Sequence, residues 1–404
     1  MTAESILHPK SLKTIFLDQP PSCLQFCPQD PDYFIVGTYF LSETKDEEGN
    51  VTAQKKTGSL QLWKLDVESK DLAHIQTVPL PYAVFDIHFH PRDSTLLGVA
   101  SSAASVALFR VSRSITEEQG DPQIQHIRTI DVHEDSSIPA LFLAWSPERF
   151  LHGKAEAFAV TYSDGRTSIF ETKNDLTKAE FTEHQFQPKQ MIEVWFVGLG
   201  TFQDDWESDK SSSFLFTGDD FGTLRTVRFA ASESEEKIED DEAALPPTLL
   251  DYSDRARHHT AGVTSILPLP VPLFQGAPLI LTGSYDEYLR VYHATQRGNV
   301  LAEMCLGGGV WRLQILRSSM PSEQTFSALV LASCMHTGTR LVRVSCDGWD
   351  EGNWNFELLA KFTEHESMNY ASDVWRGKGL KESELLVVSS SFYDKRVCVW
   401  SVEI

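Results

Sequence analysis

The stretch at 283–292, "GSYDEYLRVY", is repeated in outline at 391–400, "SFYDKRVCVW". Each copy has a small residue, an aromatic residue and an aspartate (Asp286 or Asp394), followed by alternating apolar residues that end on an aromatic side chain. A short turn between two alternating runs is typical of a β-hairpin. A chain that repeats this unit predicts a fold assembled from similar small sheets.

Seven segments follow the pattern, and successive copies lie 46 to 65 residues apart. They are "GSLQLW" (58–63), "ASVALF" (104–109), "GRTSIF" (165–170), "GTLRTV" (222–227), "EYLRVY" (287–292), "TRLVRV" (339–344) and "KRVCVW" (395–400). An apolar, β-rich run precedes each copy, and several copies have another short strand upstream, such as "VFDIHFHP" (84–91). Strand, loop and hairpin repeated at this period predict an all-β fold, a seven-bladed β-propeller.

We expect one propeller over residues 1–404, and a strand from the N-terminal segment that closes its ring. The blades are expected at about 20–66, 80–112, 138–173, 190–230, 260–296, 308–346 and 368–404. The segment 12–19, "LKTIFLDQ", has no blade of its own, so we expect it to complete the last blade and remove a free sheet edge. Two polar or acidic insertions, 42–57 and 231–248, are expected to be flexible loops.

The repeated segments resemble WD repeats, although the Trp-Asp pair itself is degenerate. Trp63 and Trp400 end their strands, and neither is followed by aspartate. In three blades a histidine precedes the turn aspartate; the pairs are His133 and Asp164, His259 and Asp286, and His365 and Asp394. In WD repeats such a histidine hydrogen-bonds through a Ser or Thr toward the aspartate and holds the loop to the blade. We therefore interpret these histidines as structural rather than catalytic.

The composition limits the classes of partner. Lys and Arg number 35 against 57 Asp and Glu, which gives a net charge of −22. This charge argues against direct nucleic-acid binding, because no surplus of cations is present to neutralise phosphates. It suits a basic protein partner, and maintaining solubility is the alternative explanation.

The sequence predicts a soluble, cytoplasmic and reduced protein. Six cysteines are scattered without a C-x-x-C pair, which is typical of an intracellular chain. The N-terminal residues lack the apolar core of a secretory signal. The most apolar long window, 264–283, contains four prolines, so we do not expect a membrane-spanning helix.

Common enzyme motifs are absent from the sequence: it has no G-x-S-x-G elbow, P-loop or H-E-x-x-H motif. The pair of histidines in "HFH" (88–90) has no evident third ligand, so we expect no metal site. Three later segments are less generic. "GGGVWRLQI" (307–315) carries Trp311 and Arg312, and "ASCMHTGTR" (332–340) places His336 near a hairpin turn that has lost its aspartate, so its imidazole is free to act as a base.

The third segment is "EHESMNYASDVW" (364–375). "TGSYDE" (282–287), "GGGVWR" (307–312), "ASCMHTG" (332–338), "HESMNYASDVW" (365–375) and "SSSFYD" (389–394) occur in this order. In these motifs the chain resembles the diphthine methylesterase family, the WD-repeat proteins of diphthamide biosynthesis. The resemblance implies hydrolysis of the methyl ester of methylated diphthine on elongation factor 2, giving diphthine and methanol. It implies that elongation factor 2 is the protein substrate and that the reaction needs no cofactor. We expect a monomer.

Ester hydrolysis of this substrate needs a base, an oxyanion partner and a lining for a trimethylammonium group. We expect His336 to be the base and Arg312 the oxyanion partner. The residues expected to contact the substrate are Trp311, Tyr285, Tyr393, Trp375, Asp373 and Glu193. Ser284, Ser391 or water could be the nucleophile, and the sequence leaves this choice open.

Each of these residues also has a structural explanation. Trp311 and Trp375 could fill gaps between blades, the two tyrosines could be packing residues, and Arg312 could pair with a neighbouring carboxylate. The alternative function is a non-catalytic scaffold in which the same aromatic residues and arginine bind a peptide.

Overall fold

The computed structural model describes residues 6–113, 120–153, 156–188, 190–230, 247–322, 325–348 and 352–404. The described residues form seven small antiparallel sheets and two short 3-10 turns, Phe150–Gly153 and Met335–Thr337. The expected all-β fold, a seven-bladed β-propeller, is confirmed. Its N-terminal strand completes the last blade, as the ladder of β1 and β29 below shows.

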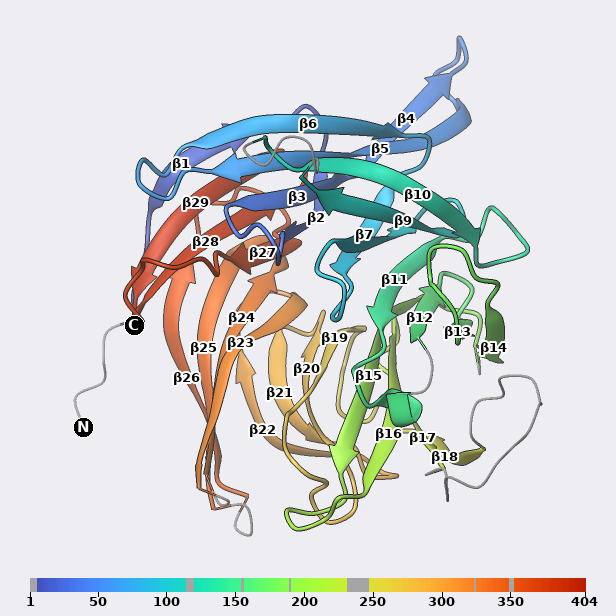
Figure 1. Ribbon diagram of the computed structural model, residues 1–404, viewed down its shortest axis with the longest axis vertical. Coiled ribbons are helices and arrows are strands. Elements are labelled where there is room, and N and C mark those ends of the chain that lie inside the picture. The colour runs from blue at the N-terminus through green and yellow to red at the C-terminus, as the bar shows by residue number, and fades with distance from the viewer. Residues whose placement is uncertain are drawn as a thin grey trace. The chain divides into compact units, whose positions relative to one another are not determined.

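The first three sheets follow one another along the chain (Figure 1). The first contains β2 (Pro21–Phe26), β3 (Tyr33–Thr38), β5 (Val51–Leu65) and β6 (Leu72–Leu80), and β4 (Phe40–Lys45) pairs with β5. The second contains β7 (Val84–Phe89), β8 (Leu96–Ser101), β9 (Ser105–Ser112) and β10 (Gln123–Asp131). The third contains β11 (Ala140–Trp145), β12 (Glu156–Tyr162), β13 (Thr167–Thr172) and β14 (Thr182–Phe186).

The remaining four sheets have the same order of strands. The fourth contains β15 (Val194–Gln203), β16 (Ser211–Asp219), β17 (Leu224–Phe229) and β18 (Thr248–Ser253). The fifth contains β19 (Val263–Pro268), β20 (Leu279–Ser284), β21 (Tyr288–His293) and β22 (Asn299–Cys305). The sixth contains β23 (Val310–Ser322), β24 (Thr325–Cys334), β25 (Gly338–Asp347) and β26 (Trp354–Phe362). The seventh contains β27 (Ala371–Val374), β28 (Glu384–Ser391), β29 (Arg396–Glu403) and β1 (Ser11–Phe16).

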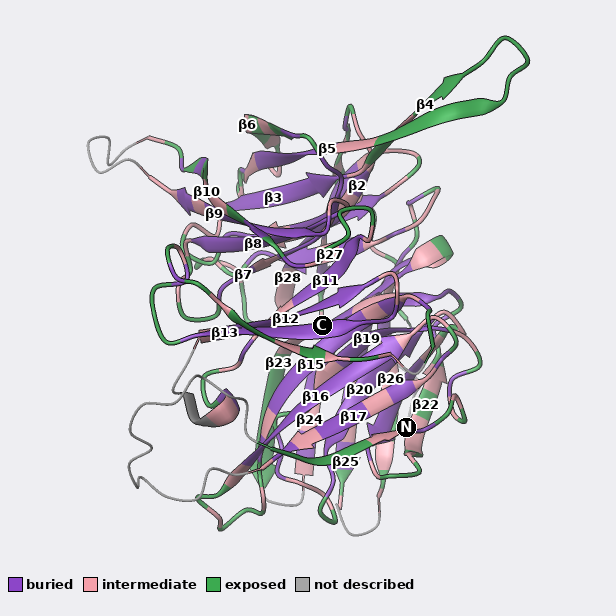
Figure 2. Ribbon diagram, turned by 90° about the vertical axis from the view of Figure 1, so that its right-hand side faces the viewer, coloured by how far each residue is buried: buried purple, intermediate pink, exposed green. Residues whose placement is uncertain are grey.

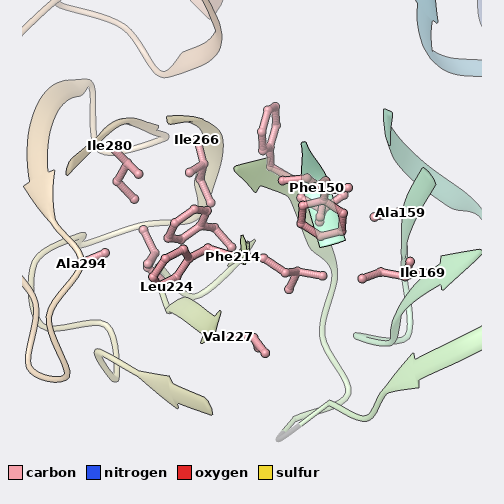
Figure 3. Close-up of a cluster of buried hydrophobic side chains, with 14 of the residues drawn as sticks. Phe150, Ala159, Ile169, Phe214, Leu224, Val227, Ile266, Ile280 and Ala294 are labelled. Atoms are coloured by element: carbon pink, nitrogen blue, oxygen red, sulfur yellow. The ribbon is translucent and has the colours of Figure 1, made fainter. Parts of the chain in front are cut away.

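The chain divides into two compact units, and each has its own buried cores. The first unit comprises 1–140, 331–342 and 358–404, and the second comprises 141–330 and 343–357. In the second unit, apolar residues of the third, fourth and fifth sheets form one core, whose members include Phe150, Phe214 and Ile266 (Figure 3). Burial of these large side chains contributes roughly 1.5–3 kcal/mol each to the stability of the folded state.

The N-terminal strand closes the last sheet within the first unit, as expected. β1 runs antiparallel to β29, with Thr14 opposite Cys398 and Phe16 opposite Arg396. Figure 1 shows β1 beside β29. The backbone N–H of Leu17 then donates to the carbonyl of Lys395 at 2.8 Å. This pairing leaves the C-terminal strand of the chain inside the sheet rather than at its edge.

The insertion at 42–57 differs from the expected flexible loop. It forms a two-stranded ladder in which Phe40 of β4 lies opposite Thr57 of β5 and Lys45 lies opposite Val51. The stretch has a polar sequence, and Figure 2 shows that it is exposed, so it has no apolar pattern. The "DEEGN" turn (46–50), with β-branched residues on both sides of it, nevertheless favours a hairpin. Residues 231–246 of the other expected loop lie outside the described residues.

The fourth strand of the first six blades lies outside the ranges expected from the sequence. These strands occupy segments that separated the expected blades; they are β6, β10, β14, β18, β22 and β26. Most side chains of the first five are partly or fully exposed. An exposed outer strand buries few apolar residues, so it has little of the apolar signal that marks the three inner strands.

The hairpin turns explain why particular residues recur there. In six blades, the turn between the second and third strands contains a residue with a positive φ angle; these residues are Ala104, Gly165, Gly222, Glu287, Gly338 and Lys395. A Cβ atom on Gly338 would lie 2.3 Å from the carbonyl oxygen of Phe362, so this turn requires glycine. Within the part of the chain that the structure describes, no helix has both the length and the apolar character needed to cross a membrane.

Candidate functional site

Two of the histidines that precede a turn aspartate are buried and hold their blades together. His259 Nε2 lies 2.9 Å from Thr282 Oγ1, and His365 Nε2 lies 2.8 Å from Ser389 Oγ. Trp400 donates its indole N–H to the same Ser389 hydroxyl at 3.0 Å. These contacts agree with the structural interpretation of both histidines.

Burial also fixes the protonation state of these two imidazoles. It lowers the pKa of His259 to about 3 and that of His365 to about 4, so both are neutral at pH 7. The third histidine, His133, has a different local contact, because its Nδ1 accepts a hydrogen bond from the backbone N–H of Asp135 at 2.9 Å.

Three aromatic side chains from neighbouring sheets of the second unit form a cluster, called here the aromatic cluster. Trp195 is the second residue of β15, Tyr285 follows β20, and Trp311 is the second residue of β23. The ring centroids of Trp195 and Trp311 lie 5.7 Å apart, and those of Tyr285 and Trp311 lie 5.8 Å apart. Trp195 and Tyr285 meet edge to face at 6.2 Å. All three are partly exposed.

A carboxylate and a glycine hold the aromatic cluster in place. Asp220 Oδ1 accepts the indole N–H of Trp195 at 2.6 Å, and the Asp220 backbone N–H donates to the Glu193 carbonyl at 2.9 Å. A Cβ atom on Gly262 would lie 2.9 Å from Tyr285 Cδ2 and 3.0 Å from the Asp220 Cα. Only glycine therefore permits the close approach of Tyr285 to the Asp220 turn.

Arg312 lies against the aromatic cluster. Its guanidinium carbon is 4.5 Å from the centroid of the Trp311 ring and 4.9 Å from that of Phe142. Its Nη1 donates to the carbonyl oxygens of Thr264 at 2.9 Å and Trp311 at 3.0 Å. These contacts orient Arg312 and place a cation on one face of Trp311.

Glu193 lies immediately before β15 and is partly buried. Its backbone carbonyl binds the Asp220 N–H, and its carboxylate makes no hydrogen bond or ion pair with the described residues. The structure thus brings Trp311, Tyr285, Arg312 and Glu193 into one unit, on segments that adjoin the aromatic cluster.

His336 lies in the first unit, in the 3-10 turn Met335–Thr337, and its side chain is exposed. The turn is fixed by its backbone: the Met335 carbonyl accepts from Asn369 N–H at 2.9 Å, and the Thr337 carbonyl accepts from Arg340 Nη1 at 2.7 Å. Among the described residues, none forms a hydrogen bond or ion pair with the His336 imidazole.

Tyr393 also lies in the first unit and is 69% exposed. Its ring meets that of Phe392 at 5.0 Å between centroids, and Phe392 in turn contacts Tyr370 at 5.4 Å and Tyr39 at 6.1 Å. Burial raises the pKa of Tyr370 to about 12, so this phenol is neutral at pH 7. The segment carrying Tyr370 is tied to the His336 turn by the bond between Asn369 and Met335.

Trp375 and Asp373 are largely buried in the first unit, and Trp375 also lines a cleft there together with Asp32. Trp375 is 8% exposed and donates its indole N–H to Asp32 at 2.8 Å. Asp373 is 2% exposed; one oxygen accepts from Phe26 N–H and the other from Arg376, at 2.8 and 2.9 Å. Both side chains thus have structural contacts, and their contact with the substrate stays a prediction.

The two serines considered as nucleophiles stabilise hairpin turns. Ser284 is fully buried and donates to the Ala261 carbonyl at 2.9 Å, and its oxygen accepts from Asp286 N–H at 3.1 Å. Ser391 is fully buried and donates to Asp394. Both hydroxyls have the local contacts that favour serine in turns.

Metal-binding side chains do not converge within the described ranges, where no group of three or more His, Cys, Asp or Glu residues is placed to hold an ion. In the "HFH" strand, His90 is buried, and its Nδ1 accepts from the backbone N–H groups of Arg92 and Asp93 at 3.2 and 3.0 Å. His90 thus stabilises a turn.

Trp195 and Asp220 were not among the residues that the sequence led us to expect in contact with the substrate. A signal was present, because "VW" occurs at 194–195, 310–311 and 374–375. Position within the strand separates the three copies: Trp195 and Trp311 lie near the beginnings of their strands, whereas Trp375 follows the last residue of β27. The "VW" dipeptide alone does not show where the tryptophan lies relative to its strand, so it could not identify Trp195 as part of the aromatic cluster.

Comparison with known proteins identifies relatives over nearly the whole chain. The chain is 27% identical over 402 residues to "Diphthine methyltransferase" of Schizosaccharomyces pombe, covering 98% of this chain and 99% of the relative. It is 25% identical over 439 residues to the protein of that name from Saccharomyces cerevisiae, covering 99% and 100%. The human protein of that name is 23% identical over 385 residues, covering 90% of this chain and 74% of the relative.

A solved structure supports the fold independently. The structure of Chaetomium thermophilum Sqt1 bound to the N-terminus of the ribosomal protein L10 matches with a TM-score of 0.52 and 11% identity, covering 96% of this chain and 97% of that one. At this identity the likeness shows the fold alone. No family model matches the chain. The resemblance indicated by the sequence motifs is thus confirmed by the curated relatives: over nearly its whole length, the chain is similar to proteins that are named for a reaction of diphthine.

Proposed function

We propose that this protein hydrolyses the methyl ester of methylated diphthine on elongation factor 2, giving diphthine and methanol. Two findings support the proposal: the curated relatives act, by name, on diphthine, and the second unit contains the aromatic cluster. The observation that carries it is the cluster of Trp195, Tyr285 and Trp311 with the Asp220 carboxylate bound to the indole.

The aromatic cluster suits the trimethylammonium group of the substrate. This group has a fixed positive charge and no N–H to donate, so ring faces recognise it better than hydrogen-bond acceptors do. The three rings touch one another, so a cation is expected on an outer ring face rather than between rings. Arg312 already lies over Trp311, and its charge directs the substrate cation to Trp195. The bond from Trp195 to Asp220 makes that indole more electron-rich.

The reaction consumes water. In the proposed step a water oxygen bonds to the ester carbonyl carbon, the bond from that carbon to the methoxy oxygen breaks, and methanol leaves. His336 takes the proton from the attacking water and returns it to the leaving methoxy oxygen, and the carboxylic acid that forms then ionises. Arg312 stabilises the negative charge that develops on the carbonyl oxygen; one such donor contributes roughly 3 kcal/mol.

Methyl transfer is the second candidate, because the name of the curated relatives specifies a methyltransferase. The direction of the mass change distinguishes the two reactions. In the proposed reaction the modified elongation factor loses the mass of one methylene group without any added methyl donor, whereas transfer adds the same mass only when a donor is supplied.

Replacement of Trp195 by alanine tests recognition of the cation. Loss of this ring is expected to lower kcat/KM for the methylated protein substrate about 10-fold, mainly through KM, because the lost contact is made before the ester reacts. The matched control is Trp206→Ala, a partly exposed tryptophan of the same unit that is not part of the aromatic cluster. Equal losses in the two variants would exclude the aromatic cluster as the cation site.

Replacement of His336 or Arg312 by alanine tests the proposed chemistry. Each variant is expected to lower kcat by about 100-fold or more while binding of the substrate protein changes little, because both groups act on the transition state. Steady-state assays and direct binding measurements separate the two effects. Normal turnover in both variants would remove these residues from the mechanism, even if the protein proved to be an esterase.

A further inference from the structure

A cleft of about 600 Å³ opens in the second unit beside the turns of the third and fourth sheets. Its lining comes from the segment before β15, the β16–β17 turn and the segment after β18; Ile192, Asp219, Phe221, Arg225 and Arg255 are among its residues. Val194, the neighbour of Trp195, also lines it. The cleft therefore borders the strand that carries part of the aromatic cluster.

Two of the charged groups in this lining are already occupied. Arg225 donates two hydrogen bonds to the Asp251 carboxylate, at 2.9 and 2.7 Å. Asp219 Oδ1 accepts the backbone N–H groups of Phe221 and Thr223 at 3.0 and 2.8 Å. Both carboxylates and the Arg225 cation are thus satisfied inside the protein.

Arg255 differs from these groups. Its side chain is exposed, and within the described ranges it makes no hydrogen bond or ion pair. Of the two arginines that line the cleft, Arg225 is thus paired with a carboxylate, and Arg255 is the one whose charge remains available to a ligand. Acidic residues greatly outnumber basic residues in this chain, whose net charge is −22, and yet Arg255 forms an ion pair with none of the described ones.

The backbone at Arg255 is held in a conformation that ordinary residues avoid. Arg255 and Ala256 both have positive φ angles, 57° and 53°. The buried Asp254 maintains them: its Oδ1 accepts from Leu224 N–H at 3.0 Å and from Ala256 N–H at 3.1 Å. Its Oδ2 accepts the Tyr292 hydroxyl at 3.0 Å. A strained backbone of this kind persists only when its surroundings hold it in place. The buried Asp254 therefore fixes the backbone at Arg255, while the Arg255 side chain stays exposed.

An exposed aromatic residue lies at the same cleft. Phe221 is 62% exposed, and its ring is one of the few large apolar side chains on the surface of this unit. A partly exposed aromatic residue together with an arginine is typical of the residues that dominate protein–protein contacts. The cleft thus offers one apolar and one cationic contact.

We propose that this cleft binds an acidic segment of the protein substrate, with a carboxylate on Arg255 and an apolar side chain against Phe221. The identity of that protein as the substrate rests on the proposed function, whereas the chemistry of the cleft does not. Negative charges far from the cleft reduce the binding of an acidic ligand only slightly at physiological salt, because charges more than about 8 Å away are screened.

The test measures binding of two fluorescein-labelled peptides to the full-length protein by fluorescence polarisation, at low and high salt. One peptide has six residues alternating Glu and Leu, and the other has Lys in place of each Glu. We expect the Glu peptide to bind more tightly, and Arg255→Glu to weaken its binding about 5- to 10-fold at low salt, with a smaller effect at high salt.

Arg149→Glu is the matched control, because Arg149 is an exposed arginine of the same unit outside the lining of the cleft, and the change in charge is identical. Phe221→Ala is expected to weaken binding equally at both salt concentrations. Equal binding of the two peptides, or equal effects of Arg255→Glu and Arg149→Glu, would overturn the inference. Binding that depends on Arg255 in a protein without esterase activity would support the cleft and contradict the proposed function instead.

Discussion

Two buried histidines, His365 and His259, make the stability of the folded protein depend on pH. His365 and His259 stay neutral in the folded protein down to about pH 4 and pH 3, because burial disfavours their charged forms. In the unfolded chain each takes up a proton near pH 6.5. Between these values the unfolded state binds more protons, so the stability that each histidine contributes falls as the pH is lowered.

The expected consequence is a loss of up to about 1.4 kcal/mol per pH unit for each histidine as the pH falls from 6.5 toward 4. Urea unfolding between pH 7.5 and pH 4.5 measures this slope. His365→Gln retains a donor for Ser389 and removes the titration, so its slope is expected to be smaller by about that amount. The same slope in the variant and in the wild type would contradict the assignment.

At the scale of residues, part of the site was predictable. Trp311 and Arg312 stood out because ordinary blades do not need them in that segment, and the structure places both beside Tyr285, which was also expected at the site. Trp375 and Asp373 had the same local appearance, and only the position of β27 shows that they point into the core. Trp195 was overlooked because contact between residues of separate sheets depends on the three-dimensional packing of these sheets.

At the scale of elements, the N-terminal strand stabilises the last sheet. β1 lies against β29 and supplies an outer strand that the C-terminal part of the chain does not contain. This strand was predictable from the sequence, because 12–19 had a strand pattern and no blade. The hairpin of β4 and β5 was not predictable, because its exposed residues have no apolar pattern. The exposed outer strands, such as β6, were missed for the same reason.

Substitution of Leu17 by proline tests the closing strand. Proline removes the hydrogen bond to the Lys395 carbonyl, so the free energy of unfolding is expected to fall by about 3 kcal/mol or more. Leu17→Met keeps the backbone bond and most of the buried volume, and is expected to cost less than about 1.5 kcal/mol. Thermal and urea unfolding of both variants provide the comparison. A proline variant as stable as the methionine variant would show that the ladder contributes little.

At the scale of the whole molecule, the sequence contained enough repetition to predict seven sheets, because each sheet repeats the same hairpin. Its motifs also indicated the diphthamide pathway, which the curated relatives support. The sequence has no motif that distinguishes hydrolysis of the methyl ester from methyl transfer, since a base and an arginine can serve either reaction. Only the chemistry of the product distinguishes them.

The central claim is that water attacks the ester carbonyl. The most direct measurement is therefore incubation of methylated diphthine-bearing elongation factor 2 with the protein in water enriched in heavy oxygen, without a methyl donor, followed by mass spectrometry of the modified peptide. Hydrolysis predicts release of methanol and one heavy oxygen atom in the new carboxylate. A modified peptide that keeps its methyl group, or loses it without gaining heavy oxygen, would contradict the account.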